Sequence, residues 1–93
     1  MLSVLDVTNF VKDYLTEKGG NVLYEEEIEG ENYFKGAPIT GLRFEKLIPR
    51  PIDIIIGSNE KLGTAIMIEN KVFHPGNTSE LEDFVDALIY GED

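Results

Sequence analysis

The stretch IDIIIGSNEKLGTAIMIE, residues 52–69, decides the fold. Four of the residues 52–56 are isoleucine, and β-branched residues favour strands. Residues 58–63 contain Ser, Asn and Gly, which are typical of a hairpin turn. The chain then returns as a second strand from Thr64 to Glu69, so we predict an antiparallel hairpin. Residues 70–73 either continue this strand after a bend or pair separately.

Further strands precede the hairpin. Residues 21–28 alternate as a strand does, although Glu26 falls among apolar residues, which indicates either a bulge or an exposed strand end. Residues 33–35 are predicted as a short strand and residues 39–48 as a longer one. The longer strand directs Leu42, Phe44 and Ile48 to one face and Arg43, Glu45 and Leu47 to the other. It ends at Pro49-Arg50-Pro51, because proline cannot donate to a β-ladder.

A helix is predicted at each end of the chain. At residues 3–18, Ser3 is the N-cap, Asp6 takes the capping-box position, and Gly19-Gly20 ends the helix. At residues 80–90, Ser79 and Glu82 form a capping box, and Gly91 is the stop. Both helices carry an apolar stripe at helical spacing, made of Val4, Val7, Val11, Tyr14 and Leu15 in the first and of Leu81, Phe84, Val85, Leu88 and Ile89 in the second.

The order of elements predicts an α+β domain spanning residues 1–93. We expect a four-stranded, or five-stranded, mainly antiparallel sheet flanked by an N-terminal and a C-terminal helix (α-β-β-β-β-α). Short loops between successive strands favour a meander.

The two helices leave the second sheet face undecided. If both helices covered one face, the other would expose Leu23, Leu47 and Ile55, with either Met67 or the pair Ile66 and Ile68. That is more apolar than a solvated face should be. Either one helix lies on each face, or the second face is an interface for another copy or another protein, or the strand parity is shifted by one residue.

Charge is distributed unevenly along the chain. The net charge is −10, and acidic residues dominate residues 1–30 and 72–93, whereas residues 31–71 are nearly neutral. Such a surface repels nucleic acid and anionic membranes, so it either engages a basic protein or maintains solubility. The chain has no cysteine and no predicted signal peptide or membrane span, from which we expect a cytoplasmic protein.

The candidate contact residues follow from this charge. On residues 21–31 they are Glu25, Glu27 and Glu29, which could equally protect a strand edge from aggregation. On the second helix they are Glu82, Asp83 and Asp86; Glu82 and Asp86 repel one another at i, i+4. Arg50 is a cation held rigidly between two prolines.

Other ionisable residues give weaker indications. Glu25 and Glu27 project to the same side of a strand, but they lack the Asp/Asn-rich loop of a calcium site. Asp53 among isoleucines is either an acid of shifted pKa or an outward-facing strand residue. His74 is expected to be a surface loop residue. The sequence therefore predicts no catalytic site, no cofactor and no metal.

We expect a small acidic, non-catalytic protein-binding module that engages a basic partner surface. An inhibitor, an immunity-type protein or an adaptor would fit, and one encoded by a phage or mobile element could imitate nucleic-acid charge. One alternative is a structural subunit that forms a homodimer through an apolar sheet face. The other is a sensor or enzyme that binds a small molecule or metal.

Overall fold

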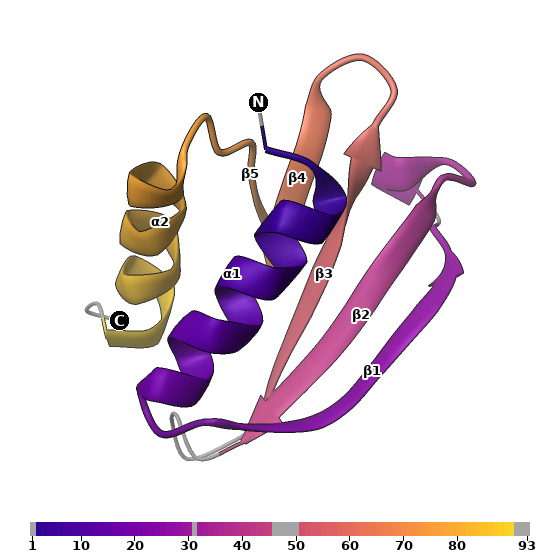
Figure 1. The fold of residues 1–93 in the computed structure, drawn as a ribbon. Coiled ribbons are helices and arrows are strands. Elements are labelled where there is room, and N and C mark those ends of the chain that lie inside the picture. Colours follow the sequence, from indigo (N-terminus) through magenta and orange to yellow (C-terminus); the bar gives the residue numbers. More distant parts are fainter. Residues whose placement is uncertain (1, 31, 46–50, 91–93) are drawn as a thin grey trace.

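The chain forms one antiparallel sheet with a helix at each end of the sequence. The computed structural model describes residues 2–30, 32–45 and 51–90. The elements are, in order, α1 (Val4–Glu17), β1 (Asn21–Glu29), the 3₁₀ turn η1 (Asn32–Phe34), β2 (Pro38–Glu45), β3 (Ile52–Asn59), β4 (Gly63–Ile68), β5 (Lys71–Phe73) and α2 (Thr78–Tyr90). The strands lie in the order β1-β2-β3-β4-β5, all antiparallel (Figure 1). The predicted α+β fold is confirmed, and the fifth strand is a separate one.

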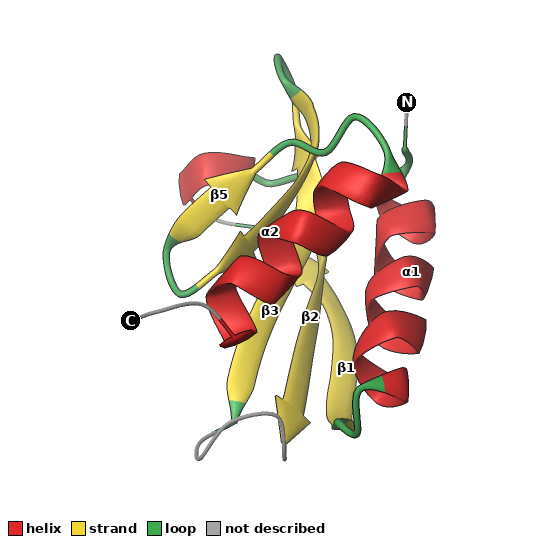
Figure 2. Cartoon of the chain, turned by 90° about the vertical axis from the view of Figure 1, so that its left-hand side faces the viewer, coloured by secondary structure: helices red, strands yellow, loops and turns green. Residues whose placement is uncertain are grey.

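Both helices pack on the same face of the sheet (Figure 2). Alternate residues of β3 and β4 and two of β2 make a continuous apolar surface, which is wide enough for two helices. The buried cluster comprises Val7, Val11 and Leu15 of α1, Leu81 and Val85 of α2, and Leu42, Phe44, Ile52, Ile54, Ile56, Ile66 and Ile68 of the sheet. The alternative of one helix on each face is therefore wrong. We call this covered surface the helix side and the other surface the open face.

The helix ends show where capping was predicted correctly. Ser3 Oγ accepts from the Asp6 amide at 3.0 Å, while the Ser3 amide donates to Asp6 Oδ2 at 3.1 Å. These hydrogen bonds lower the pKa of Asp6. Gly19 follows in a left-handed conformation with φ +100°, as predicted for this helix end.

The start of α2 was predicted two residues too late. The Glu80 amide donates to Asn77 Oδ1 at 2.9 Å, and the Glu80 carboxylate accepts from the Gly76 amide at 2.8 Å. Asn77 therefore caps the helix, and the predicted Ser79–Glu82 box is wrong. Several capping residues stand side by side here, so spacing alone does not distinguish them. The predicted stop at Gly91 lies outside the described residues.

The strand predicted at residues 33–35 is also wrong, because the chain forms η1 there. Lys35 and Gly36 take positive φ values of 44° and 88°, which reverse the chain before β2. The Phe34 ring then lies over Gly57 of β3, where a Cβ atom would stand 2.9 Å from Phe34 Cδ1. Phe34, Ile39 and Ala65 form a second, smaller buried cluster on the open face. Burial of this ring explains why the segment does not remain extended.

The bulge in β1 lies earlier than Glu26. The register with β2 shifts between Val22 and Tyr24. Beyond it, Glu25, Glu27 and Glu29 stand opposite Leu42, Thr40 and Pro38, on the helix side, whereas Tyr24, Glu26 and Ile28 belong to the open face. All nine residues of β1 are exposed. Glu26 therefore lies on an exposed strand, which was the second of the two predicted options.

In the other strands, the residues predicted to share a face do share it, wherever the structure describes them. Leu42 and Phe44 are buried on the helix side, and Arg43 lies on the open face opposite Asp53. Ile55 pairs with Met67 on the open face, so Ile66 and Ile68 belong to the helix side. Leu23 lies at the bulge and is 47% exposed. Leu47 and Ile48 lie outside the described residues.

None of the helices in the described part of the chain is long and apolar enough to cross a membrane.

Candidate functional site

A groove separates α1 from β1 on the helix side. The two elements diverge from the Gly19-Gly20 turn, so the space between them opens toward the N-terminus of α1 (Figure 1). Val7, Val11 and Leu15 direct α1 onto the isoleucines of β3 and β4 and leave β1 uncovered. The resulting hollow measures about 750 Å³ and combines acidic (Glu25, Glu27), apolar (Val4, Leu5, Pro38) and hydroxyl-bearing (Thr8, Thr40, Ser58) residues, and it also borders Glu26 and Ile39, which belong to the open face.

The acidic wall of the groove is only partly neutralised. Lys12 of α1 reaches across to Glu25, with Nζ 2.7 Å from Oε1. Both side chains remain substantially exposed, at 33% and 42%, so solvent screens the pair and it contributes little to stability. Glu27 has no hydrogen-bond or ion-pair partner among the described residues. The groove therefore retains negative charge that the fold does not use.

Apolar and hydroxyl groups complete the groove. Leu5 lines the groove and is 67% exposed. Thr8 is only 4% exposed, and its Oγ1 has no hydrogen-bond partner in the described part of the chain. A buried hydroxyl without a partner costs about 1–3 kcal/mol. A ligand group that reached Thr8 would recover part of that cost.

Sequence reasoning missed Thr8 because it treated only apolar residues as members of the inward stripe. The signal was its position. Thr8 stands four residues after Val4 and three before Val11, so it lies beside the buried face of α1. Leu5 was missed for the opposite reason, because an exposed apolar residue outside the stripe carries no signal until the groove is known.

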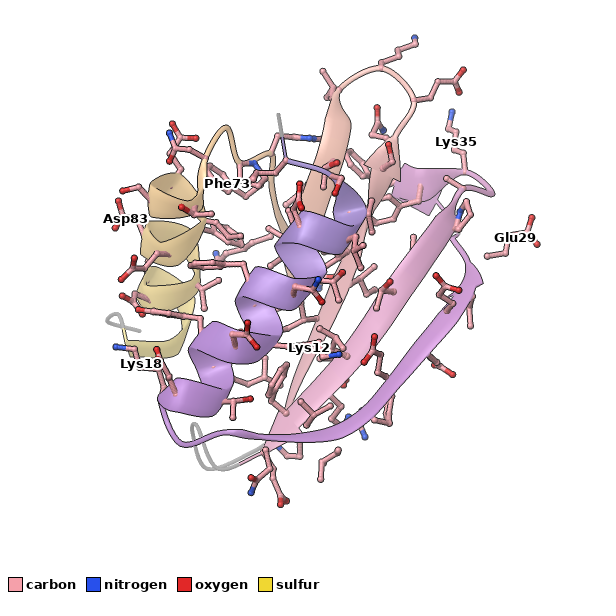
Figure 3. All side chains as sticks on the ribbon, viewed as in Figure 1. Lys12, Lys18, Glu29, Lys35, Phe73 and Asp83 are labelled. Atoms are coloured by element: carbon pink, nitrogen blue, oxygen red, sulfur yellow. The ribbon has the colours of Figure 1, made fainter. Side chains whose placement is uncertain are left out.

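The acids of α2 form a second group, on the other side of α1 from β1 (Figure 3). Glu82 and Asp83 are exposed, and Asp83 has no partner among the described residues. Asp86 is half-buried and accepts from the Tyr14 hydroxyl, with 2.8 Å to each carboxylate oxygen. Burial, and then this hydrogen bond, raise the pKa of Tyr14. Asp86 thus joins α2 to α1, besides any role in binding.

The predicted contact residues consequently do not form one site. Glu25 and Glu27 line the groove, whereas Glu29 lies at the far end of β1 and points away from the fold (Figure 3). Glu82, Asp83 and Asp86 belong to the separate surface of α2. Arg50 lies outside the described residues.

The open face carries a different set of groups. Arg43 Nε and Nη2 donate to Asp53 at 2.6 and 2.8 Å, and the guanidinium carbon lies 5.5 Å from the centre of the Tyr24 ring. The hydrogen bond from Arg43 lowers the pKa of Asp53. Of the two predicted options, Asp53 is therefore the outward-facing strand residue. Its pKa is also shifted, in the direction that favours the ionised carboxylate.

An apolar hollow of about 340 Å³ lies on the open face, between β1 and β4. Ile28, Ile55, Met67 and Tyr33 line it, with Glu29 at its border. The Tyr33 hydroxyl contacts His74 Nε2 at 2.5 Å, and His74 Nδ1 lies 3.0 Å from the Thr64 carbonyl. The carbonyl accepts from Nδ1, so in the neutral ring Nε2 accepts from Tyr33. His74 lies in the predicted loop but is half-buried, and it anchors η1.

The described residues contain no group of three or more His, Cys, Asp or Glu side chains that could hold a metal ion.

Comparison of the chain with protein-family models, with curated proteins and with solved structures finds no match.

Proposed function

We propose that the chain is a small, non-catalytic, acidic module that binds the basic surface of another protein, with the groove between α1 and β1 as the main contact. The observation that carries this proposal is the combination, in one groove, of Glu27, an acid without a partner among the described residues, and Leu5, an exposed leucine. Protein interfaces combine an apolar centre with a polar rim in this way.

The distribution of charge over the elements supports the same proposal. The elements α1, β1 and α2 carry eleven acids against one base, Lys12. The acids are Asp6, Asp13, Glu17, Glu25, Glu26, Glu27, Glu29, Glu80, Glu82, Asp83 and Asp86. The other described residues carry four acids (Glu45, Asp53, Glu60, Glu69) and five bases (Lys18, Lys35, Arg43, Lys61, Lys71). A surface this one-sided accelerates encounter with a basic partner.

Solubility alone would also require acidic residues, but it would not require an exposed leucine among them. An enzyme that binds nucleic-acid phosphates presents a basic surface of the required kind. The proposal therefore includes an inhibitor or immunity-type protein whose acids imitate those phosphates, and equally an adaptor.

Affinity capture with matched variants tests the proposal. The bait proteins are wild type, the double variant Leu5→Ser/Glu27→Gln, and the control Glu60→Gln, which changes one acid in the β3–β4 turn away from the groove. A partner bound by wild type and Glu60→Gln at low salt should be lost at high salt. It should also be lost from the groove variant. Equal capture by all three baits, or capture that ignores salt, would contradict the proposal.

The apolar hollow on the open face favours a second candidate, self-association. Most of the unbalanced acids of α1, β1 and α2 lie elsewhere, with Glu26 the exception on this face, so two copies that meet through Ile55, Met67 and Val72 would keep most of their charge apart. Val72 and Ile28 are 36% and 47% exposed on this face. Light scattering over a range of concentrations tests this, and a mass that stays at 10.4 kDa throughout would exclude it.

A further inference from the structure

β1 is an open edge of the sheet. It stands at one end of the strand order, all nine of its residues are exposed, and Figure 1 shows it at the outer margin of the fold. The opposite edge, β5, has only three residues. An edge strand presents backbone N–H and C=O groups that have no partner within the sheet and that can pair with another strand.

We propose that the partner contributes an extended, basic segment that adds to β1 as a further strand, along Glu25–Glu29. This inference rests on the proposed function and specifies the form of the partner's contact. Strand addition of this kind combines main-chain hydrogen bonds, which give affinity, with alternate side chains, which give specificity.

The register of β1 defines the length of the contact. The ladder with β2 is regular from Tyr24 to Glu29, so the outer groups of this part alternate as in an ideal strand. The shift between Val22 and Tyr24 interrupts the alternation. An added strand therefore finds a continuous edge only beyond the bulge, which is the part that carries the glutamates.

The two faces of β1 define the chemistry of the added segment. Glu25, Glu27 and Glu29 belong to the helix side, while Glu26 and Ile28 belong to the open face. A neighbouring strand places its side chains directly beside these residues, and opposite charges in such pairs stabilise. The matching segment has lysine or arginine at every second position. The intervening residues are mainly aliphatic, because Ile28 is half-exposed on their side.

The groove explains why the basic residues of an added strand should lie on the helix side of β1. Basic side chains on the helix side of an added strand would lie next to Glu27 and would face the groove that Leu5 and Thr8 line. Their stems would cover Leu5 and their charges would meet the acids. The same arrangement excludes a second copy of this chain, because two β1 strands would set glutamates against glutamates.

A peptide titration tests the inference. The probe is a fluorescent peptide of about seven residues, the length of a typical strand, that alternates lysine with valine. Its control has the same side chains, but the amides that would face β1 are N-methylated. If the peptide adds as a strand, the control should bind at least about tenfold more weakly, because it has lost the main-chain hydrogen bonds. Amides within Glu25–Glu29 should also exchange more slowly with deuterium when the unmodified peptide is bound.

Variants separate strand addition from general attraction. Glu25→Gln/Glu27→Gln/Glu29→Gln removes three charges from β1, and Asp13→Asn/Glu17→Gln/Glu60→Gln removes three elsewhere. The first should weaken binding of the unmodified peptide far more than the second. Equal binding of both peptides, or equal loss in both variants, would overturn strand addition. Salt-sensitive capture of a partner through the groove would still support the proposed function, so the two proposals can fail separately.

Discussion

The helix side and the open face of the sheet differ in how they are protected from water. On the helix side, two amphipathic helices cover the isoleucines of β3 and β4 and present their acids outward. On the open face, η1 covers only the region of Gly57, and Ile55 and Met67 remain half-exposed beside the Arg43–Asp53 pair. The difference teaches that most of the buried core lies on the helix side, so substitutions on β1 and at the half-exposed positions of the open face should disturb folding less.

Two neighbouring isoleucines give the strongest test of this contrast. Ile54 is fully buried under the helices, whereas Ile55 is half-exposed on the open face. Ile54→Ala should lower the free energy of unfolding by about 2–5 kcal/mol, because it removes buried methyl groups and leaves a cavity. Ile55→Ala should lower it by only about 1 kcal/mol, since less area is withdrawn from water. Urea denaturation measures both, and similar losses would contradict the assignment of faces.

The contrast also explains which elements could be predicted from the sequence. The cap at Ser3 and Asp6, the end of α1 at Gly19, and the isoleucine strands all follow from local patterns of spacing and residue type. The η1 turn does not, because it depends on Phe34 meeting Gly57, a residue more than twenty positions away in the sequence. A local pattern carries no information about such a contact.

The candidate site was predictable in part for a related reason. The run of acidic residues indicated Glu25 and Glu27, and their spacing correctly predicted that both side chains lie on one side of β1. The groove itself depends on the angle at which α1 leaves β1, which the packing of Val11 and Leu15 against the sheet determines. The division of the acids between two surfaces follows from the same packing, since α1 lies between β1 and α2.

Glycine substitutions sharpen the comparison within the open face. A Cβ atom at Gly57 would lie 2.5 Å from Ile39 Cγ2 and 2.9 Å from Phe34 Cδ1, whereas one at Gly41 would meet nothing nearer than Glu26 Cγ at 3.8 Å. Gly57→Ala should therefore displace η1 and cost about 1–3 kcal/mol. Gly41→Ala should change stability by no more than about 0.5 kcal/mol. Thermal unfolding compares the two, and equal midpoints would show that Phe34 and Ile39 do not pack closely on Gly57 of β3.

Among the described residues, Thr8 Oγ1 on the helix side is the one buried side-chain polar atom without a hydrogen-bond partner, and its replacement should increase stability, whereas the substitutions above decrease it. Thr8→Val replaces the unpartnered buried hydroxyl by a methyl group of similar shape, so it should raise the free energy of unfolding by about 1 kcal/mol. Thr16→Val is the matched control, because Thr16 is exposed on the same helix and should show little change. A loss of stability in Thr8→Val, measured in urea, would mean that the hydroxyl is satisfied in solution.

The smallest expected effect concerns the ion pair of the open face. The hydrogen bond from Arg43 holds the pKa of Asp53 below its ordinary value. A carboxyl group whose pKa is lower in the folded state stabilises the fold above its unfolded pKa of about 4, and this contribution disappears as the pH falls through the folded value. Asp53→Asn should therefore cause a small loss of stability at neutral pH, because solvent screens an exposed pair.

The pH dependence of that loss distinguishes the pair from a simple change of charge. The difference in melting temperature between wild type and Asp53→Asn should shrink toward zero as the pH falls through the folded-state pKa of Asp53, which lies below about 4, because only below that value is Asp53 protonated in both folded and unfolded wild type. A difference that grew with acid would mean that Asp53 is destabilised by ionisation. The Arg43–Asp53 pair would then destabilise the open face instead of neutralising its charge. Self-association through this face would lose the argument that the pair leaves it without net charge.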